Sequence, residues 1–265
     1  MTRLSRRQLL VGSGGLMTAL AGCTNRGMSP GDSATTTDTA LSTHVSGTNL
    51  VVTVPSTKEQ RHLSLIAPDG TAVETAPIAP GATRVSVPLG GQYAPGDYTL
   101  TTTDGHQRSV TLRPDLTIEG FTVGQQALDR LPESLGHTAR TEAIVTITNT
   151  GTGPTTIAGL RVTGDVPAPT EPLTIPEATG VYGTVADGEH DGVVVEPDAT
   201  TEVITNSLPF LFAGQAASCV SMPATGTIEI EVTAAAGDTT TTATAPVQYE
   251  GQSDEQCRIT SGSVD

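Results

Sequence analysis

The sequence predicts an all-β fold in which two antiparallel β-sandwich domains follow an export signal and a flexible tether. Three observations predict this fold. Short runs alternate apolar and polar residues with a period of two. Turn-forming Pro, Gly and Asp residues separate these runs at spacings of about ten residues, which is typical of small antiparallel sandwiches. After the signal, only the short stretch "GQQALDRLPESLG" offers even a weak helix candidate.

Residues 1–22 are predicted to be a signal peptide. Arg6 and Arg7 follow Ser5 and precede Leu9 and Leu10, which is the twin-arginine pattern read by a translocase for folded proteins. The apolar run that follows is broken by glycines and is much shorter than the roughly 20 apolar residues that span a bilayer. It therefore indicates export and not a membrane-spanning helix.

The signal ends in Leu20-Ala21-Gly22-Cys23. Small residues suit the cleavage groove of a signal peptidase, and a cysteine directly after them suits lipidation. We expect a lipid on Cys23 to hold the mature protein on the extracellular face of the cell membrane. The alternatives are an ordinary cleaved signal, or a buried amphipathic helix that contains a chance cysteine.

Residues 23–43 are expected to form a disordered tether. After Cys23 this segment reads "TNRGMSPGDSATTTDTALST", which is rich in Ser, Thr, Gly and Asp and has no apolar periodicity. It would lift the folded part of the protein off the membrane.

Residues 44–114 are expected to form the first β-sandwich. Its predicted strands are "NLVVTVP", "HLSLIAPDG", "RVSVPL", "DYTLTTTDG" and "RSVTLRP", which are separated by Pro-Asp-Gly, Pro-Gly and Asp-Gly turns. Within the fourth run, Tyr98 lies two residues before Leu100. We expect Tyr98 to be a core and corner residue and not a ligand contact.

Residues 115–265 are expected to form the second β-sandwich, joined to the first at Pro114. Its predicted strands include "RPDLTIEGFTV", "TEAIVTITNTGTGPTTIAGLRVTG", "GVVVEP", "TEVITNSL" and "GTIEIEVTAAAG". The apolar stretch "LPFLFAG" at residues 208–214 is predicted to be a strand or a loop that covers the core.

Two of these stretches carry a family resemblance. "PGDYTL" resembles the tyrosine corner of immunoglobulin-like domains. "AIVTITNTGTGPTTI" is similar to the strand–turn–strand of CARDB-like domains, which are sandwiches on prokaryotic cell surfaces. Together with the signal, the chain resembles a haloarchaeal surface lipoprotein with immunoglobulin-like modules. The resemblance implies a fold and a location, and it transfers no catalytic residues.

The mature chain is strongly acidic. Removing the signal takes away three of the 13 basic residues and none of the 28 acidic ones, so the net charge changes from −15 to −18. Phosphate recognition requires Lys and Arg, so this charge argues against nucleic acid as a partner. The composition is typical of salt-loving archaea, because concentrated salt screens clustered carboxylates. An acidic extracellular protein of another origin is the alternative.

The number of cysteines agrees with export. Lipidation of Cys23 leaves Cys219 and Cys257, and an oxidising compartment allows them to form a disulfide. Two free thiols or a two-cysteine metal site are the alternatives. The metal site is weakly supported because no histidine lies at ligand spacing.

One stretch has the spacing of a calcium loop. In "DGEHDGVVVEPD", Asp187, Glu189 and Asp191 alternate before a glycine, and Asp198 lies at the twelfth position. Glu189 is longer and Asp198 is shorter than the usual residues at their positions, and strands flank the loop where helices are usual. These departures favour a solvated hairpin turn, and apart from this possible Ca²⁺ we expect no cofactor.

Neither a nucleophile elbow nor a phosphate-binding glycine loop occurs, and the aromatic fraction is only 3%. We therefore expect no enzyme. The sequence favours a non-catalytic envelope lipoprotein that binds other envelope proteins or stiffens the cell coat. The alternatives are an accessory subunit of a transport or secretion complex, including one that captures a ligand, and a calcium-dependent adhesin.

Overall fold

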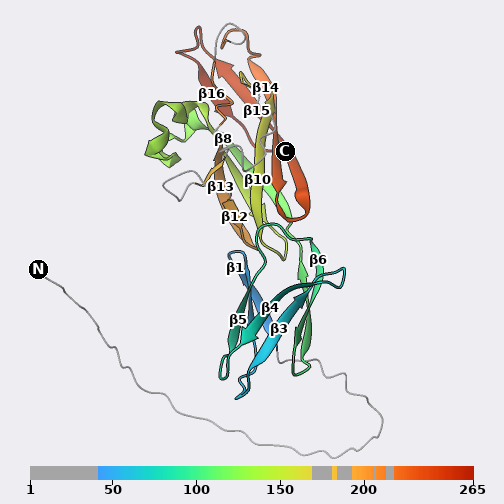
Figure 1. The fold of residues 1–265 in the computed structure, drawn as a ribbon. Coiled ribbons are helices and arrows are strands. Elements are labelled where there is room, and N and C mark those ends of the chain that lie inside the picture. Colours follow the sequence, from blue (N-terminus) through green and yellow to red (C-terminus); the bar gives the residue numbers. More distant parts are fainter. Residues whose placement is uncertain (1–40, 169–180, 184–192, 206, 213–217) are drawn as a thin grey trace, which may run out of the picture. The chain divides into compact units, whose positions relative to one another are not determined.

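A computed structural model describes residues 41–168, 181–183, 193–205, 207–212 and 218–265. The described part of the chain is all-β, as predicted. Its strands form four antiparallel sheets, and its helical segments are all short 3₁₀ turns (Figure 1). None of these helical segments is long and apolar enough to cross a membrane.

The first two sheets are built from residues before Pro114 and enclose one core. One sheet has the order β1-β2-β5, with β1 at Ser42–Ser46, β2 at Asn49–Thr53 and β5 at Arg84–Pro88. The other has the order β4-β3-β6-β7, with β3 at Arg61–Ile66, β4 at Ala72–Ile78, β6 at Gly96–Thr102 and β7 at Gln107–Leu112. Alternate residues of these strands, including Leu50, Leu63 and Leu100, meet in a common apolar cluster.

Tyr98 has the corner role predicted for it. Its side chain is buried, and its hydroxyl donates a hydrogen bond to the carbonyl of Ala94 over 2.7 Å. The ring of Tyr93 packs edge-on against it, with 6.4 Å between the ring centroids. Tyr98 therefore fastens the segment before β6 to the core.

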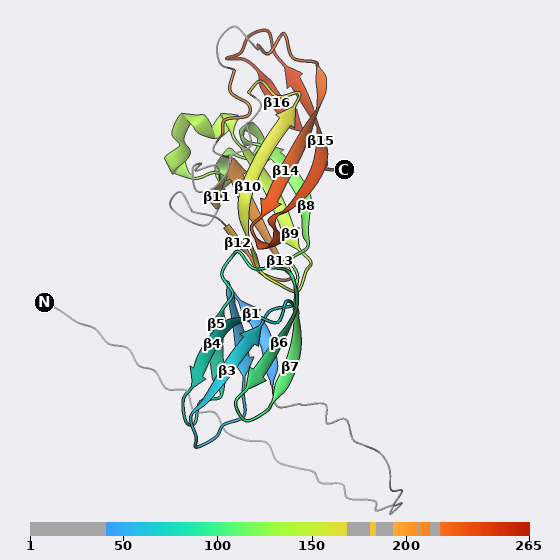
Figure 2. The ribbon, with the colours of Figure 1, turned by 45° about the vertical axis from the view of Figure 1, so that its right-hand side comes forward.

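The other two sheets enclose a second core (Figure 2). One has the order β11-β13-β9-β8, with β8 at Leu116–Val123, β9 at Ala143–Asn149, β11 at Val181–Gly183 and β13 at Ala199–Thr205. The other has the order β12-β10-β14-β15-β16, with β10 at Thr155–Gly164, β12 at Val193–Val195, β14 at Thr225–Ala234, β15 at Thr239–Glu250 and β16 at Arg258–Ser261. Both sheets contribute buried aliphatic residues to one cluster, which is the arrangement of a β-sandwich.

A run of 3₁₀ turns covers the outer face of β9 and β13. It consists of η1 (Gly124–Gln126), η2 (Leu128–Arg130) and η3 (Glu133–Thr141). Ile144 and Ile204 are paired across β9 and β13, and they pack with four buried residues of this run. The weak helix candidate in this stretch therefore forms separate turns. Pro132 precedes η3, and Gly136 within it has a non-helical backbone at φ 54° and ψ −127°.

The ordered strands begin slightly before the predicted start of the first sandwich at residue 44, since Leu41 is buried and β1 starts at Ser42. The predicted join at Pro114 lies between the end of β7 and the start of β8. Next to it, the buried side chain of Asn149 donates to the carbonyls of Gly153 and Val195 and accepts from the amides of Asp115 and Gly151. Asn149 thus uses its full hydrogen-bonding capacity to hold the Asn-x-Gly turn.

Candidate functional site

Most of the residues singled out in the sequence lie outside the part of the chain that the structure describes. These are Arg6, Arg7, Cys23, Asp187, Glu189 and Asp191. Asp198 is described. It is exposed in the turn between β12 and β13 with φ 58°, and its amide donates to the carbonyl of Asn149. Within the described ranges, no group of three or more His, Cys, Asp or Glu residues could hold a metal ion. The calcium loop stays a prediction.

The predicted disulfide is confirmed. Cys219 and Cys257 are bonded, with 5.8 Å between their Cα atoms, and both are buried at the edge of the second core. The amide of Cys219 also donates to Asp254 Oδ1 over 2.7 Å. The bond joins the loop before β14 to the loop before β16.

Two glutamines of η1 fix the second of these loops. The side-chain amide of Gln125 donates to the Cys257 carbonyl over 3.1 Å and accepts from the Ile259 amide over 3.0 Å. Gln126 accepts from the amide of Ser261 over 2.8 Å. These side chains bond to the free edge of β16 in the way a neighbouring strand would, so they tie the disulfide to the 3₁₀ turns.

A cleft of about 300 Å³ lies where the 3₁₀ turns and the segment after β13 meet the loop before β16. This loop carries Cys257, and we call it the disulfide loop. We call the cleft the disulfide cleft. Its lining consists of Gln125, His137, Arg140, Thr141, Phe210, Leu211, Phe212, Asp254, Glu255 and Cys257.

The apolar part of the cleft comes from the predicted apolar stretch "LPFLFAG". Phe210 is almost fully buried, with its ring 6.1 Å from that of Phe121, and its amide donates to the Thr141 carbonyl. Phe212 packs edge-on against Tyr249. Leu211, which lies between these two residues in the sequence, is 37% exposed. The described part of the stretch, residues 208–212, therefore covers the core as a loop, which is one of the two predicted alternatives. It also presents apolar surface to the cleft.

The charged lining of the cleft is divided between two segments. Arg140 comes from η3, whereas Asp254 and Glu255 come from the disulfide loop. Among the described residues, neither Arg140 nor Glu255 forms an ion pair. By contrast, Arg130 of the same 3₁₀ run pairs with Glu202. The cleft therefore holds opposite charges that do not neutralise each other.

A buried carboxyl group lies one residue beyond the cleft lining. Glu142 is 1% exposed, and its Oε2 accepts hydrogen bonds from the Thr205 hydroxyl and the Leu208 amide. Its Oε1 has no partner in the described structure. Burial is the main cause that raises the pKa of Glu142 to about 7, against smaller opposing effects of its hydrogen bonds. Nothing in the sequence singles out this glutamate, because it simply precedes an apolar strand.

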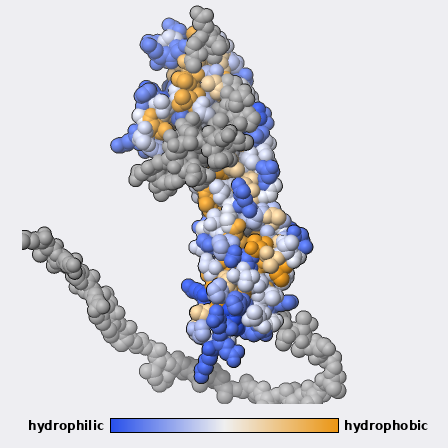
Figure 3. Space-filling model, in the orientation of Figure 1, coloured by the Kyte–Doolittle hydropathy of each residue, from blue (hydrophilic) through white to orange (hydrophobic). Residues whose placement is uncertain are grey.

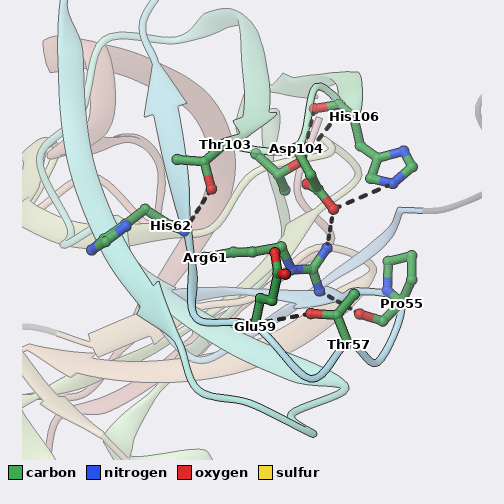
Figure 4. A network of polar contacts seen from close by, with 9 residues as sticks. Pro55, Thr57, Glu59, Arg61, His62, Thr103, Asp104 and His106 are labelled. Carbon is green, nitrogen blue, oxygen red and sulfur yellow. Dashed lines mark hydrogen bonds and ion pairs between the residues drawn. The ribbon is translucent and has the colours of Figure 1, made fainter.

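A second polar network lies near the end of the first core (Figure 4). The guanidinium of Arg61 is buried. It donates to Asp104 Oδ2 over 2.6 Å and to the Pro55 carbonyl. Hydrogen bonds from Thr102 and Arg61 lower the pKa of Asp104, and His106 Nε2 lies 3.6 Å from the same carboxylate. The network clamps the loop before β3 to the β6–β7 turn, which is a structural role.

No protein-family model matches the chain, and no curated protein matches it in sequence. Among solved structures it is similar to an alpha-2-macroglobulin from Salmonella, with 12% identity and a TM-score of 0.22. That match covers 78% of this chain and 14% of the macroglobulin. It is also similar to the CupB2 chaperone of Pseudomonas aeruginosa, with 11% identity and a TM-score of 0.18 over 74% of this chain and 90% of the chaperone. Likenesses this weak give no indication of function.

Proposed function

We propose that this protein is a non-catalytic envelope lipoprotein, exported through its twin-arginine signal and anchored by a lipid on Cys23 at the extracellular face of the membrane. The single observation that carries the proposal is the buried Cys219–Cys257 disulfide. It occurs in a chain whose first 22 residues have the sequence pattern of an export signal. Structural disulfides persist in oxidising compartments outside the cytoplasm. The odd cysteine, Cys23, then lies where lipidation is expected.

The proposal includes two immunoglobulin-like domains, residues 44–114 and a CARDB-like domain from residue 115 to residue 265. Support comes from two separate apolar clusters, each between a pair of antiparallel sheets, and from the hydrogen bond of Tyr98 to Ala94. The interiors are filled with aliphatic side chains, which suits rigid modules that present surfaces to other envelope proteins.

The surface composition supports an extracellular role in concentrated salt. The face in Figure 3 shows mostly hydrophilic residues with small, separate hydrophobic areas. With a net charge of −18 after cleavage, the mature protein would repel nucleic acid and anionic surfaces at low salt. Screening in molar salt would remove most of that repulsion while the carboxylates stay hydrated.

Substitution of the anchoring cysteine tests the proposal. We expect Cys23→Ala to move the exported protein from the membrane fraction into the medium. Without the lipid, only the signal's apolar run could hold the protein, and this run is too short to span the membrane. The matched control is the double variant Cys219→Ala/Cys257→Ala, which should stay membrane-bound. Retention of Cys23→Ala in the membrane after a carbonate wash would overturn the lipid anchor. Normal export of Arg6→Lys/Arg7→Lys would overturn the twin-arginine route.

The disulfide cleft favours a second candidate, an accessory or ligand-capturing subunit of an envelope complex. Crosslinking in cells at native salt separates the two candidates. Reproducible capture of one membrane complex would support the accessory subunit. Capture of coat proteins alone would support the structural module.

A further inference from the structure

The disulfide cleft offers charges of both signs and an apolar surface to the same small volume. Arg140 supplies the cation, Glu255 and Asp254 supply the anions, and Leu211 supplies exposed aliphatic surface. Arg140 and Glu255 come from segments that are distant in the sequence, and within the described residues neither forms an ion pair. Both charges are therefore available to a ligand that carries the complementary pair.

We infer that the disulfide cleft binds a small zwitterion with an apolar side chain, namely a free apolar α-amino acid such as leucine. The planar guanidinium of Arg140 suits a carboxylate, which it can bind through two parallel hydrogen bonds. The carboxylate of Glu255 pairs with the α-ammonium group. The aliphatic side chain packs against Leu211 and the partly exposed ring of Phe212.

The size and construction of the cleft fit this ligand class. At about 300 Å³ the cleft lies at the lower end of small-molecule pockets, so it suits a single amino acid better than a long ligand. Its anionic wall is held in place, because Asp254 Oδ1 bonds to the Cys219 amide and Gln125 bonds to the Cys257 carbonyl. Since the charged groups are exposed, we expect a Kd on the order of 0.1–1 mM.

Calorimetry on the purified full chain tests the inference with three probes: leucine, N-acetyl-leucine and leucinamide. Acetylation removes the ammonium charge, and amidation removes the carboxylate. We expect saturable binding of leucine and at least tenfold weaker binding of both derivatives. Equal binding of leucinamide would indicate recognition of a peptide N-terminus, and equal binding of N-acetyl-leucine would indicate a peptide C-terminus. Either result, or no binding of leucine, overturns the inference.

Substitutions of the charged residues that line the cleft test whether leucine binds there. We expect Arg140→Gln to weaken leucine binding at least tenfold and to remove the preference for leucine over leucinamide. Glu255→Gln should remove the preference for leucine over N-acetyl-leucine. The matched controls Arg130→Gln and Glu133→Gln alter the same 3₁₀ run outside the cleft lining and should bind leucine as the wild type does.

Leucine binding that survives Arg140→Gln in a folded protein would place the ligand elsewhere and overturn the inference. NMR titration of the unmodified chain gives a second measurement that does not depend on a variant. Leucine should shift the signals of Leu211 and Glu255 with the same saturation curve as the calorimetry. Shifts confined to other residues would also overturn it.

Discussion

The hydroxyl of Thr205 donates a hydrogen bond over 2.5 Å to Oε2 of Glu142, in the interior between β9 and the end of β13. The Thr205 hydroxyl also accepts a hydrogen bond from the Ala143 amide. This pair fixes the start of β9 to the end of β13, where the segment leading to Phe210 departs. The cost of this arrangement is a buried carboxyl group whose other oxygen is unpartnered.

The buried Glu142 makes stability depend on pH. Its pKa rises from 4.5 in the unfolded chain to about 7 in the folded protein, so the folded state binds the proton more tightly. The stabilisation is fully present below pH 4.5 and is lost as pH rises to about 7. Over this range the free energy of unfolding should fall by about 3 kcal/mol from this group alone.

Replacing Glu142 isolates this contribution. In Glu142→Gln the decrease between pH 4.5 and 7 should be missing from the variant's own stability profile, because the amide cannot ionise. The stability of the wild type relative to the variant should therefore fall by about 3 kcal/mol over this range. Urea unfolding at fixed salt and a series of pH values measures it. Glu133→Gln, an exposed change on η3, should leave the pH profile unaltered. An unchanged profile in Glu142→Gln would contradict the burial effect.

The sequence predicted the strands that contain large apolar residues in alternation and missed those that do not. β3 alternates Leu63 and Leu65 with polar residues, and its burial follows the same period. β15 was not predicted, because its first half reads "TTTTATA". Only its last residues, such as Val247 and Tyr249, are large and buried. Pairing with β14 along the whole length of β15 makes it a strand, and this pairing is a long-range effect.

The disulfide cleft shows a similar limit. The cysteine pair follows from the number of cysteines once Cys23 is assigned to the lipid. Arg140 and Glu255, however, lie in segments more than a hundred residues apart in the sequence. They reach one cleft because Gln125 binds the backbone at Cys257 and because Phe210 binds the backbone at Thr141. No local pattern in the sequence carries that information.

The buried Arg61 should matter more for stability than any exposed arginine. Arg61→Met would leave Asp104 and the Pro55 carbonyl without their cation donor, and we expect a loss of about 2–4 kcal/mol in the free energy of unfolding. Asp104 is 32% exposed and can be rehydrated, which keeps the loss below that of a fully buried pair. Arg84→Met, at an exposed position of β5, should cost less than about 0.5 kcal/mol. Equal losses in the two variants, measured by urea unfolding, would contradict this role.

The ion pair between Arg61 and Asp104 should also make stability sensitive to acid. Because the pKa of Asp104 is lowered, its ion pair stabilises the fold above pH 3.8, and this contribution is lost as pH falls further. In Asp104→Asn the free energy of unfolding should therefore fall less steeply below pH 3.8 than it does in the wild type. Acid titration of the unfolding free energy, with Asp97→Asn as an exposed control, checks this; identical curves for Asp104→Asn and wild type would contradict it.

Calcium should leave the stability unchanged if the acidic loop is a solvated turn. Asp198 is the one predicted calcium ligand among the residues that the structure describes. It lies exposed in a turn, and its amide donates a hydrogen bond to the Asn149 carbonyl. We expect added Ca²⁺ to shift the Tm by less than about 1 °C in the wild type and in Asp187→Asn/Asp191→Asn alike. A rise in Tm with Ca²⁺ that the double variant abolishes would establish the site and favour the calcium-dependent adhesin.

The disulfide should stabilise the second core mainly by restricting the unfolded chain. It closes a loop with a sequence separation of 38 residues, and for a loop of this size we expect a contribution of about 3–4 kcal/mol. Cys219→Ser/Cys257→Ser should lower the free energy of unfolding by this amount. Because Cys257 lines the disulfide cleft, the variant should also lose the positioning of the Asp254–Glu255 segment. Alkylation and mass spectrometry of the untreated protein give the control, since neither cysteine should react before reduction. Two reactive thiols in the native protein would contradict the bond, and an unaltered unfolding curve in the variant would contradict its energetic role.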